Sequence, residues 1–178
     1  MTRCILALMQ SLQPLLTYPP IDRIRRNHGL EHATIHLLSR KRRVSVVGRS
    51  DLSGFVLMGD LSEEEIIEAA HEALARMKSG ERDLAIHPTC GTNFVTSAAF
   101  AALAAFVGFF GARSFSDRLS RIPLVFALIT GSLILAQPVG LSLQANVTTS
   151  GDMRDMEIVS VRKVSDFPAL THRVETRG

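Results

Sequence analysis

The sequence predicts a small, mixed α+β soluble domain that is interrupted by a transmembrane hairpin of two helices. Two long segments, residues 94–112 and 122–144, contain no Asp, Glu, Lys or Arg, although 21% of the whole chain is charged. About 20 apolar residues in a helix are enough to cross the hydrocarbon core of a bilayer. The sequence on either side is charged throughout and has helical and strand-like patterns. A soluble–membrane–soluble layout follows from these observations.

With 178 residues, the chain has room for one domain and a membrane element. We expect an amphipathic segment at residues 1–20, lying on the membrane or on the domain. Residues 21–93 and 145–178 together are expected to form the single soluble domain. The hairpin is expected to occupy residues 94–144.

The soluble domain is predicted to have the order α–β–β–α–β before the hairpin and two further strands after it. Ser62 and Glu65 form a capping box at the start of an amphipathic helix. Runs rich in β-branched and apolar residues mark the strands. The predicted helices cover residues 21–39 and 62–79, and the predicted strands cover residues 44–47, 54–59, 84–87, 156–164 and 171–176.

Small residues line the first apolar segment and favour close helix packing within lipid. They are Ser97, Ala101, Ala104, Ala105 and Gly108, and we expect Gly131 and Ser132 of the second segment to meet them. Pro138 is expected to kink or end the second helix. Neither segment contains His or a charged residue, so a proton relay or ion path within the bilayer is not expected. The hairpin is interpreted as an anchor.

An even number of crossings places both parts of the soluble domain on one side of the membrane. The connection at residues 113–121 has three arginines and one aspartate, which favours the cytoplasm for that connection. The soluble domain has arginine clusters of its own and no evident export signal, which favours the cytoplasm for the domain instead. We predict an integral protein of the inner or plasma membrane, with a cytoplasmic domain and membrane lipid as a partner.

Nucleic acid is not an expected partner, even though the net charge is +3. The dense basic cluster at residues 40–43 has no aromatic residue beside it for base stacking. Such a cluster beside a membrane segment contacts anionic headgroups or is solvated. The two cysteines, Cys4 and Cys90, are too few for a disulfide framework, which fits a reducing compartment.

The candidate chemistry lies in the first predicted helix, at His28-Gly29-Leu30-Glu31-His32. At about 100° per residue, His28 and His32 stand one turn apart on one helix face, so both imidazoles can reach one Zn²⁺. Glu31 lies beside that face, where it can act as the general base towards an attacking water. The pattern H-x-x-E-H resembles the reversed zinc motif of the inverzincin metallopeptidases. We therefore predict a zinc site with His28 and His32 as ligands and Glu31 as the catalytic residue.

A catalytic zinc needs a third protein ligand, and the sequence leaves several candidates. The resemblance to pitrilysin-type peptidases implies a glutamate on a later helix, but the glutamates of the 62–79 helix are closer in sequence than that family's spacing. Other candidates have side chains of suitable ligand chemistry. The set of further ligands is His87, Cys90, His172, His36 and Glu68.

Structural roles are the alternative for each of these residues. His28 and His32 can cap or hydrogen-bond within a polar interface, and His87 before Pro88 can close a turn. Cys90 can pack as a small hydrophobic side chain. His71 lies between Glu68 and Glu72 and fits a solvated helix position.

Two functions of different class remain open at this point. The first is a membrane-anchored zinc-dependent hydrolase, most simply a peptidase whose substrates include other membrane proteins. The second is a non-enzymatic accessory or assembly subunit of a larger membrane complex, which the Phe- and Ala-rich hairpin favours. A haem or chlorin site on the soluble-side histidines is a third, minor alternative.

Three motifs together resemble an uncharacterised bacterial membrane family, the domain of unknown function 6391. They are NHGLEHATIHLL at residues 27–38, AIHPTCGTN at 85–93 and THRVET at 171–176. The resemblance spans roughly residues 20–176. It implies a soluble domain with a membrane hairpin, and it implies no particular activity.

Overall fold

The computed structural model describes residues 11–42, 44–167 and 169–178. The first half of the amphipathic segment predicted at residues 1–20 therefore lies outside the described residues. The chain forms two compact units, one from the residues up to His87 together with Ala145–Gly178, and one from Pro88–Gln144. The predicted mixed α+β class is confirmed, because helices accompany a four-stranded antiparallel sheet.

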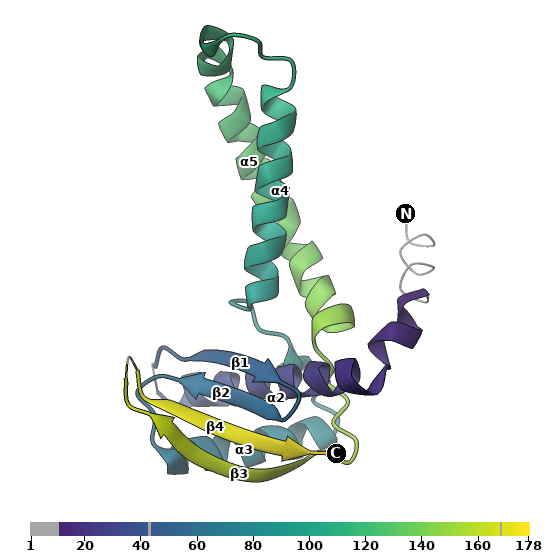
Figure 1. The fold of residues 1–178 in the computed structure, drawn as a ribbon, viewed down its shortest axis with the longest axis vertical. Helices are drawn as coiled ribbons and strands as arrows, with labels where there is room; N and C mark the ends of the chain where they lie inside the picture. The colour runs from purple at the N-terminus through teal and green to yellow at the C-terminus, as the bar shows by residue number, and fades with distance from the viewer. Residues whose placement is uncertain (1–10, 43, 168) are drawn as a thin grey trace. The chain divides into compact units, whose positions relative to one another are not determined.

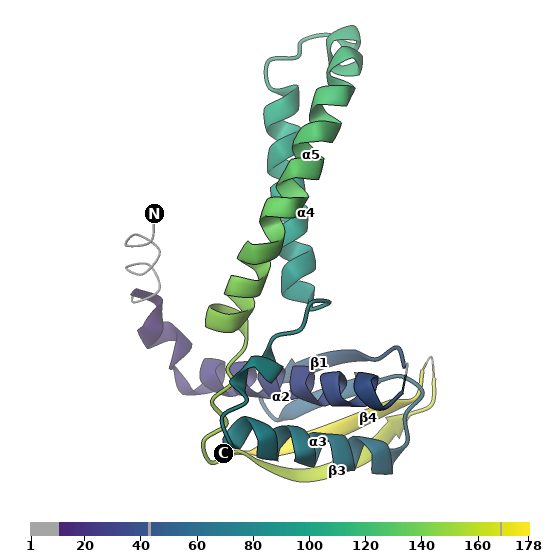
Figure 2. The same cartoon turned by 180° about the vertical axis from the view of Figure 1, so that it is seen from behind.

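The first unit is a sheet with two helices along one face (Figures 1 and 2). The strand order is β1-β2-β4-β3, and every neighbouring pair is antiparallel. The two C-terminal strands thus join the strands that precede the hairpin in one sheet. The bounds are α2 Pro19–Lys41, β1 Val47–Asp51, β2 Gly54–Met58, α3 Glu63–Lys78, β3 Glu157–Ser165 and β4 Thr171–Arg177.

The core of this unit lies between the sheet and the two helices. Phe55 and Leu57 on β2 and Val174 on β4 are buried, because alternate side chains of these strands face the helices. Leu30 from α2 and Ile66 from α3 fill the space opposite. The predicted capping box begins α3, where Ser62 and Glu65 exchange hydrogen bonds with each other's backbone N–H. The apolar residues on one face of α2 and of α3 therefore pack both helices against the sheet.

Two predicted strands differ from the structure. Residues 84–87 are not a strand, because the chain forms a short 3₁₀ helix, η1 (Arg82–Ala85), which buries Leu84 and Ala85. The first strand begins at Val47, where the prediction of 44–47 ends, and continues through polar residues to Asp51. This edge strand is polar because Gly48 and Ser50 accommodate the Glu31 side chain of α2.

The second unit is an antiparallel helical hairpin, α4 (Gly91–Phe109) and α5 (Phe115–Leu143), whose helices run side by side (Figure 1). Most of the connection predicted at residues 113–121 is helical, since Ser114 and Asp117 form a capping box that starts α5. Pro138 does not end the helix. The π-helical turn η2 (Gln144–Thr148) follows α5 and leads back to the first unit.

Both hairpin helices are long and apolar enough to cross a membrane. Only 11% of the apolar window in α4 and 17% of that in α5 is buried, so neither is the core helix of a soluble domain. The helices meet closely at Gly108, where an added Cβ would lie 2.6 Å from a methyl group of Val125. Gly131 is predicted to meet the small residues of α4, but nothing lies within 4 Å of its Cβ position. It faces away from α4.

Candidate metal-binding site

Helix α2 presents His28 and His32 one turn apart. Pro19 and Pro20 occupy its first positions, where their missing N–H groups cost nothing, and the helix then runs unbroken through both histidines. The two imidazole rings lie with their centroids 4.3 Å apart, at an interplanar angle of 63°. His32 is 4% exposed and His28 is half-buried. The pair is therefore fixed by regular helix geometry at the boundary of the core.

Each of these rings is hydrogen-bonded through Nδ1 to a backbone carbonyl. Nδ1 of His28 lies 3.0 Å from the Thr148 oxygen, and Nδ1 of His32 lies 2.7 Å from the Ala85 oxygen. A carbonyl oxygen only accepts, so Nδ1 carries a hydrogen in each ring, and in the neutral tautomer the lone pair is then on Nε2. Metal-ligating histidines are oriented in this way by an acceptor on their other nitrogen. In the neutral form of each ring, Nε2 is therefore the nitrogen that could bind a metal.

Gly29 allows the two carbonyl-bearing segments to approach α2. A Cβ at this position would overlap the Ser150 carbonyl oxygen and lie 3.2 Å from the Ala85 Cβ. The backbone N–H of Ser150 also donates to the carbonyl of Arg25, at 2.9 Å. Gly29 is therefore required for packing, because a side chain at this position would push away both segments whose carbonyls bind the histidines.

Arg25 holds the segment that carries the Thr148 carbonyl. Its guanidinium donates to the carbonyls of Asn146, Val147 and Thr149 at 3.1, 2.7 and 3.0 Å. Burial is the larger influence on this side chain and lowers the pKa of Arg25, and the negative charge of Asp22 opposes that effect. The three hydrogen bonds surround Thr148 in the chain, so Arg25 fixes the acceptor of His28 from one turn away on the same helix.

His87 and His36 extend the pair into a histidine cluster, defined here as His28, His32, His36 and His87. The His87 ring centroid lies 5.9 Å from that of His32 and 6.2 Å from that of His36. Burial lowers the pKa of His36, and the charges of Arg40 and Arg76 lower it further, so this ring is neutral at pH 7. A neutral ring keeps a lone pair for a metal.

A thiol, that of Cys90, follows the histidine cluster in the chain. Cys90 belongs to the hairpin unit, where it caps α4 by accepting a hydrogen bond from the Thr92 N–H at 3.4 Å. It follows His87 by three residues, a span of at most about 11 Å of chain. Imidazole and thiolate together are ligands suited to zinc and related ions.

Glu31 faces the edge strand of the sheet. Its carboxylate is 4% exposed and accepts a hydrogen bond from the Ser50 hydroxyl of β1. Gly48 on the same strand lacks the Cβ that would overlap a carboxylate oxygen of Glu31. Sequence reasoning did not identify Gly48 or Ser50. The sequence pattern that could have identified them is the spacing of two between a glycine and a small polar residue, which places both on one face of a strand.

The remaining candidate ligands lie outside the histidine cluster. Glu68 is exposed and pairs with Lys41 at 2.8 Å. His172 is buried in the middle of the sheet, where its neighbours across the strands are Leu57 and Lys163. His71 is exposed on α3. The structure therefore brings His28, His32, His36 and His87 together from the predicted set, and it gives Glu68 and His172 other surroundings.

Together, the fold and this cluster define a class of small α+β proteins with an apolar two-helix hairpin and a set of ligands that could hold a metal. The chain belongs to the family described as Domain of unknown function (DUF6391), whose model matches residues 23–161. It is also similar to an uncharacterized protein of Picosynechococcus sp. (strain PCC 7002), with 38% identity over 80 residues. That match covers 39% of each chain, so it spans about two fifths of the relative's length. No solved structure matches the chain.

Proposed function

We propose that this protein is a membrane-anchored, zinc-dependent hydrolase that acts on polypeptides. His28 and His32 are the first two zinc ligands, and Glu31 is the general base. The observation that carries the proposal is the pair of Nδ1 hydrogen bonds to the Thr148 and Ala85 carbonyls. Metal-ligating histidines are oriented by an acceptor on the ring nitrogen that does not bind the metal, and two rings oriented in this way one helix turn apart support a metal site.

The donor set fits zinc and leaves room for catalysis. Catalytic zinc sites use three protein ligands and keep a fourth position open, whereas structural sites are closed by four. The third ligand in this proposal is His87, whose ring lies beside that of His32, or Cys90, which follows three residues later in the chain. A zinc ion held there would act as a Lewis acid that polarises the scissile carbonyl.

Glu31 supplies the proton chemistry in this proposal. As the general base, the Glu31 carboxylate would accept a proton from the attacking water and return it to the leaving amine. The Ser50 hydroxyl fixes one carboxylate oxygen, and Gly48 leaves space for the other. A buried, hydrogen-bonded carboxylate keeps one orientation, which general-base catalysis requires.

The hairpin supplies the anchor. Its exposed phenylalanines include Phe94, Phe106 and Phe110 on α4 and Phe126 on α5, and an apolar surface of this extent is unfavourable in water. We infer that α4 and α5 cross a membrane with the α+β unit on the cytoplasmic side. Helix α4 begins at Gly91, only four residues after His87. The most accessible substrates would then be segments of membrane proteins close to the bilayer.

Metal analysis of the purified full-length protein tests the proposal. The wild type is expected to contain about one zinc per chain, and His32→Ala is expected to lose it. His71→Ala is the matched control, because His71 is exposed on α3 and should leave the zinc content unchanged. A metal-free wild type, or zinc retained in His32→Ala, would refute the zinc site.

A second candidate function is that of an accessory subunit in a larger membrane complex. The exposed apolar residues of the hairpin favour it, since they suit a protein partner as well as lipid. Glu31→Gln separates the two proposals. The hydrolase predicts zinc retained and peptide turnover lost, whereas the accessory subunit predicts a partner that co-purifies in mild detergent and is unaffected by this variant. An absorbance spectrum tests the haem or chlorin alternative.

A further inference from the structure

The sheet has an open edge at β1, which is its outermost strand beside β2 (Figure 1). The Ser53 carbonyl accepts a hydrogen bond from a backbone N–H of β4 at 2.9 Å, so Val56, three residues later, points the other way, towards β1. Arg49 pairs with Val56, and the backbone N–H and C=O groups of its neighbours Gly48 and Ser50 therefore point outward. Within the described residues, neither Gly48 nor Ser50 forms a backbone hydrogen bond.

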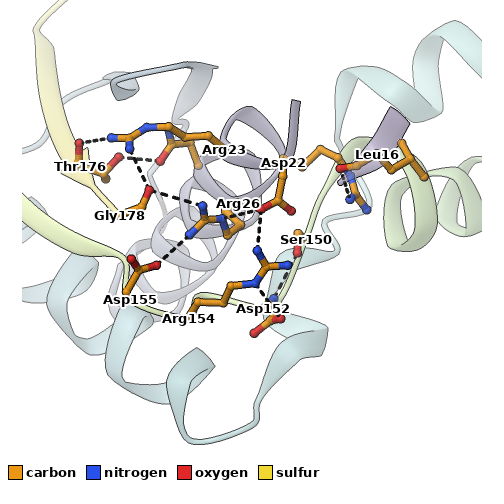
Figure 3. Close-up of polar contacts among 12 residues, drawn as sticks. Leu16, Asp22, Arg23, Arg26, Ser150, Asp152, Arg154, Asp155, Thr176 and Gly178 are labelled. Carbon is orange, nitrogen blue, oxygen red and sulfur yellow. Dashed lines mark hydrogen bonds and ion pairs between the residues drawn. The ribbon is translucent and has the colours of Figure 1, made fainter. Parts of the chain in front are cut away.

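Other exposed parts of the same sheet are protected. The opposite edge strand, β3, has two register irregularities, and its Lys163 N–H donates to the Glu63 carboxylate at 3.2 Å. At one end of the sheet, Arg23 donates to the carbonyls of Thr176 and Gly178 at 2.7 and 2.8 Å (Figure 3). Irregular pairing and charged side chains are two ways in which proteins prevent other chains from pairing with a sheet edge. Strand β1 pairs with β2 in an unbroken register, and no described side chain binds its outward backbone groups.

We propose that the outer edge of β1 binds an extended segment of another protein, which adds to the sheet as a further strand. Gly48 and Ser50 together present two donors and two acceptors with the spacing of alternate strand residues, and an extended backbone is the partner that matches all four. This binding requires neither a metal nor catalysis, so it goes beyond the proposed hydrolase.

The exposed face of β1 indicates which side chains the bound segment carries. Arg49 is exposed and forms no ion pair with a described residue, whereas Asp51 on the same face is paired with Arg173 at 2.6 Å. Val47, also on this face, is 59% exposed. Residues directly opposite each other in neighbouring strands interact through their side chains. The segment is therefore expected to place an acidic residue opposite Arg49 and an apolar residue, two positions away, opposite Val47.

A peptide titration of the isotope-labelled full-length protein, followed by NMR, tests this inference. The probe is Thr-Val-Thr-Glu-Thr-Val-Thr, whose central glutamate can face Arg49 while a valine faces Val47 in either strand direction. A metal chelator is present throughout, so the result does not depend on the zinc site and the peptide is not consumed. The amide signals of Gly48 and Ser50 are expected to shift, and their hydrogens to exchange more slowly, as the peptide saturates the protein.

Two N-methylated peptides are the matched controls, because a methyl group removes a backbone donor and keeps the side chain. One peptide is methylated on the two threonines beside the glutamate, and the other on the glutamate and the valine before it. Since alternate N–H groups of a strand point to opposite edges, only one of the two should lose affinity, by about tenfold or more. Loss on threonine methylation assigns an antiparallel segment, and loss in the other peptide assigns a parallel one.

Arg49→Glu tests the expected acidic residue. It should weaken binding of the probe about threefold or more and favour a peptide with lysine in place of glutamate, whereas Arg118→Glu, an exposed change in the hairpin, should do neither. The inference is overturned if the probe does not saturate, if the two methylated peptides behave alike, or if Arg49→Glu leaves the preference unchanged. Protection of the same amides in a dimer that forms without peptide would assign the edge to a second copy of the chain and would also overturn it.

Discussion

Replacement of Gly29 by alanine should destabilise the protein, although alanine is the better helix former. In an open helix the change would stabilise by about 0.5–1 kcal/mol. Here the added Cβ would approach the Ser150 carbonyl oxygen to less than 3.0 Å, with the Ser150 carbonyl carbon at 3.1 Å and the Ala85 Cβ at 3.2 Å. The obstacle is backbone, which cannot rotate away, so the overpacking cost of roughly 1–3 kcal/mol exceeds the helix gain.

The same substitution should weaken metal binding. Both segments that Gly29 admits carry a histidine acceptor, the Ala85 carbonyl for His32 and, two residues before Ser150, the Thr148 carbonyl for His28. Loss of such orienting bonds typically costs about 10–100-fold in metal affinity. The decrease should therefore be visible in the same sample as the loss of stability.

Chemical denaturation followed by circular dichroism, together with zinc titration against a competing chelator, measures both effects. Gly131→Ala is the matched control, because this glycine is also within a helix but nothing lies within 4 Å of its Cβ position. It should leave both quantities unchanged or slightly raise the stability. A Gly29→Ala protein with wild-type stability and wild-type zinc affinity would show that the segments do not press on α2 as described.

Three further outcomes are expected. Arg25→Ala should lower zinc affinity about tenfold, because it releases the backbone carbonyls around Thr148. Arg82→Ala is the control and should not lower it, because Arg82 is exposed and does not hydrogen-bond to those carbonyls. Equal effects of the two variants in chelator competition would exclude a positioning role for Arg25. Burial lowers the pKa of His36 in the folded state, so protonation of this imidazole makes the protein less stable as the pH falls below about 6.5. Well above that pH, His36 leaves the stability unchanged. His36→Asn should therefore flatten the acid side of the curve of stability against pH, and an unchanged curve would contradict this. Gly48→Ala should displace the Glu31 carboxylate and so reduce peptide turnover by about 10²-fold, while the zinc content stays constant. Turnover at the wild-type rate in this variant would argue against Glu31 as the general base.

The helices and the ligand pair were predictable from sequence because both depend on local periodicity. The spacing of His28 and His32 places them on one face of any α-helix, and the apolar residues around Leu30 indicate which face is buried. The capping box at Ser62 and the uncharged run from Phe94 are equally local signals. Each of them survives in the structure because no tertiary contact opposes it.

The partners of the histidines could not be predicted. The acceptors at Ala85 and Thr148 are backbone carbonyls far away in the sequence, and a carbonyl has no sequence signature. The short apolar run at residues 84–87 suggested a strand, but its burial against α2 rather than beside another strand makes it η1. The polar residues 48–51 suggested a loop, yet they pair with β2 because a two-residue turn joins Asp51 to Gly54.

X-ray absorption at the zinc edge of the purified protein tests the central claim most directly. The account predicts a first shell of about two imidazole nitrogens at 2.0–2.1 Å and one sulfur at about 2.3 Å, or three nitrogens if His87 replaces Cys90, with the remaining position occupied by oxygen. In His32→Ala the nitrogen count should fall. A first shell of oxygen alone, or a spectrum unchanged in His32→Ala, would contradict a zinc site on the α2 histidines.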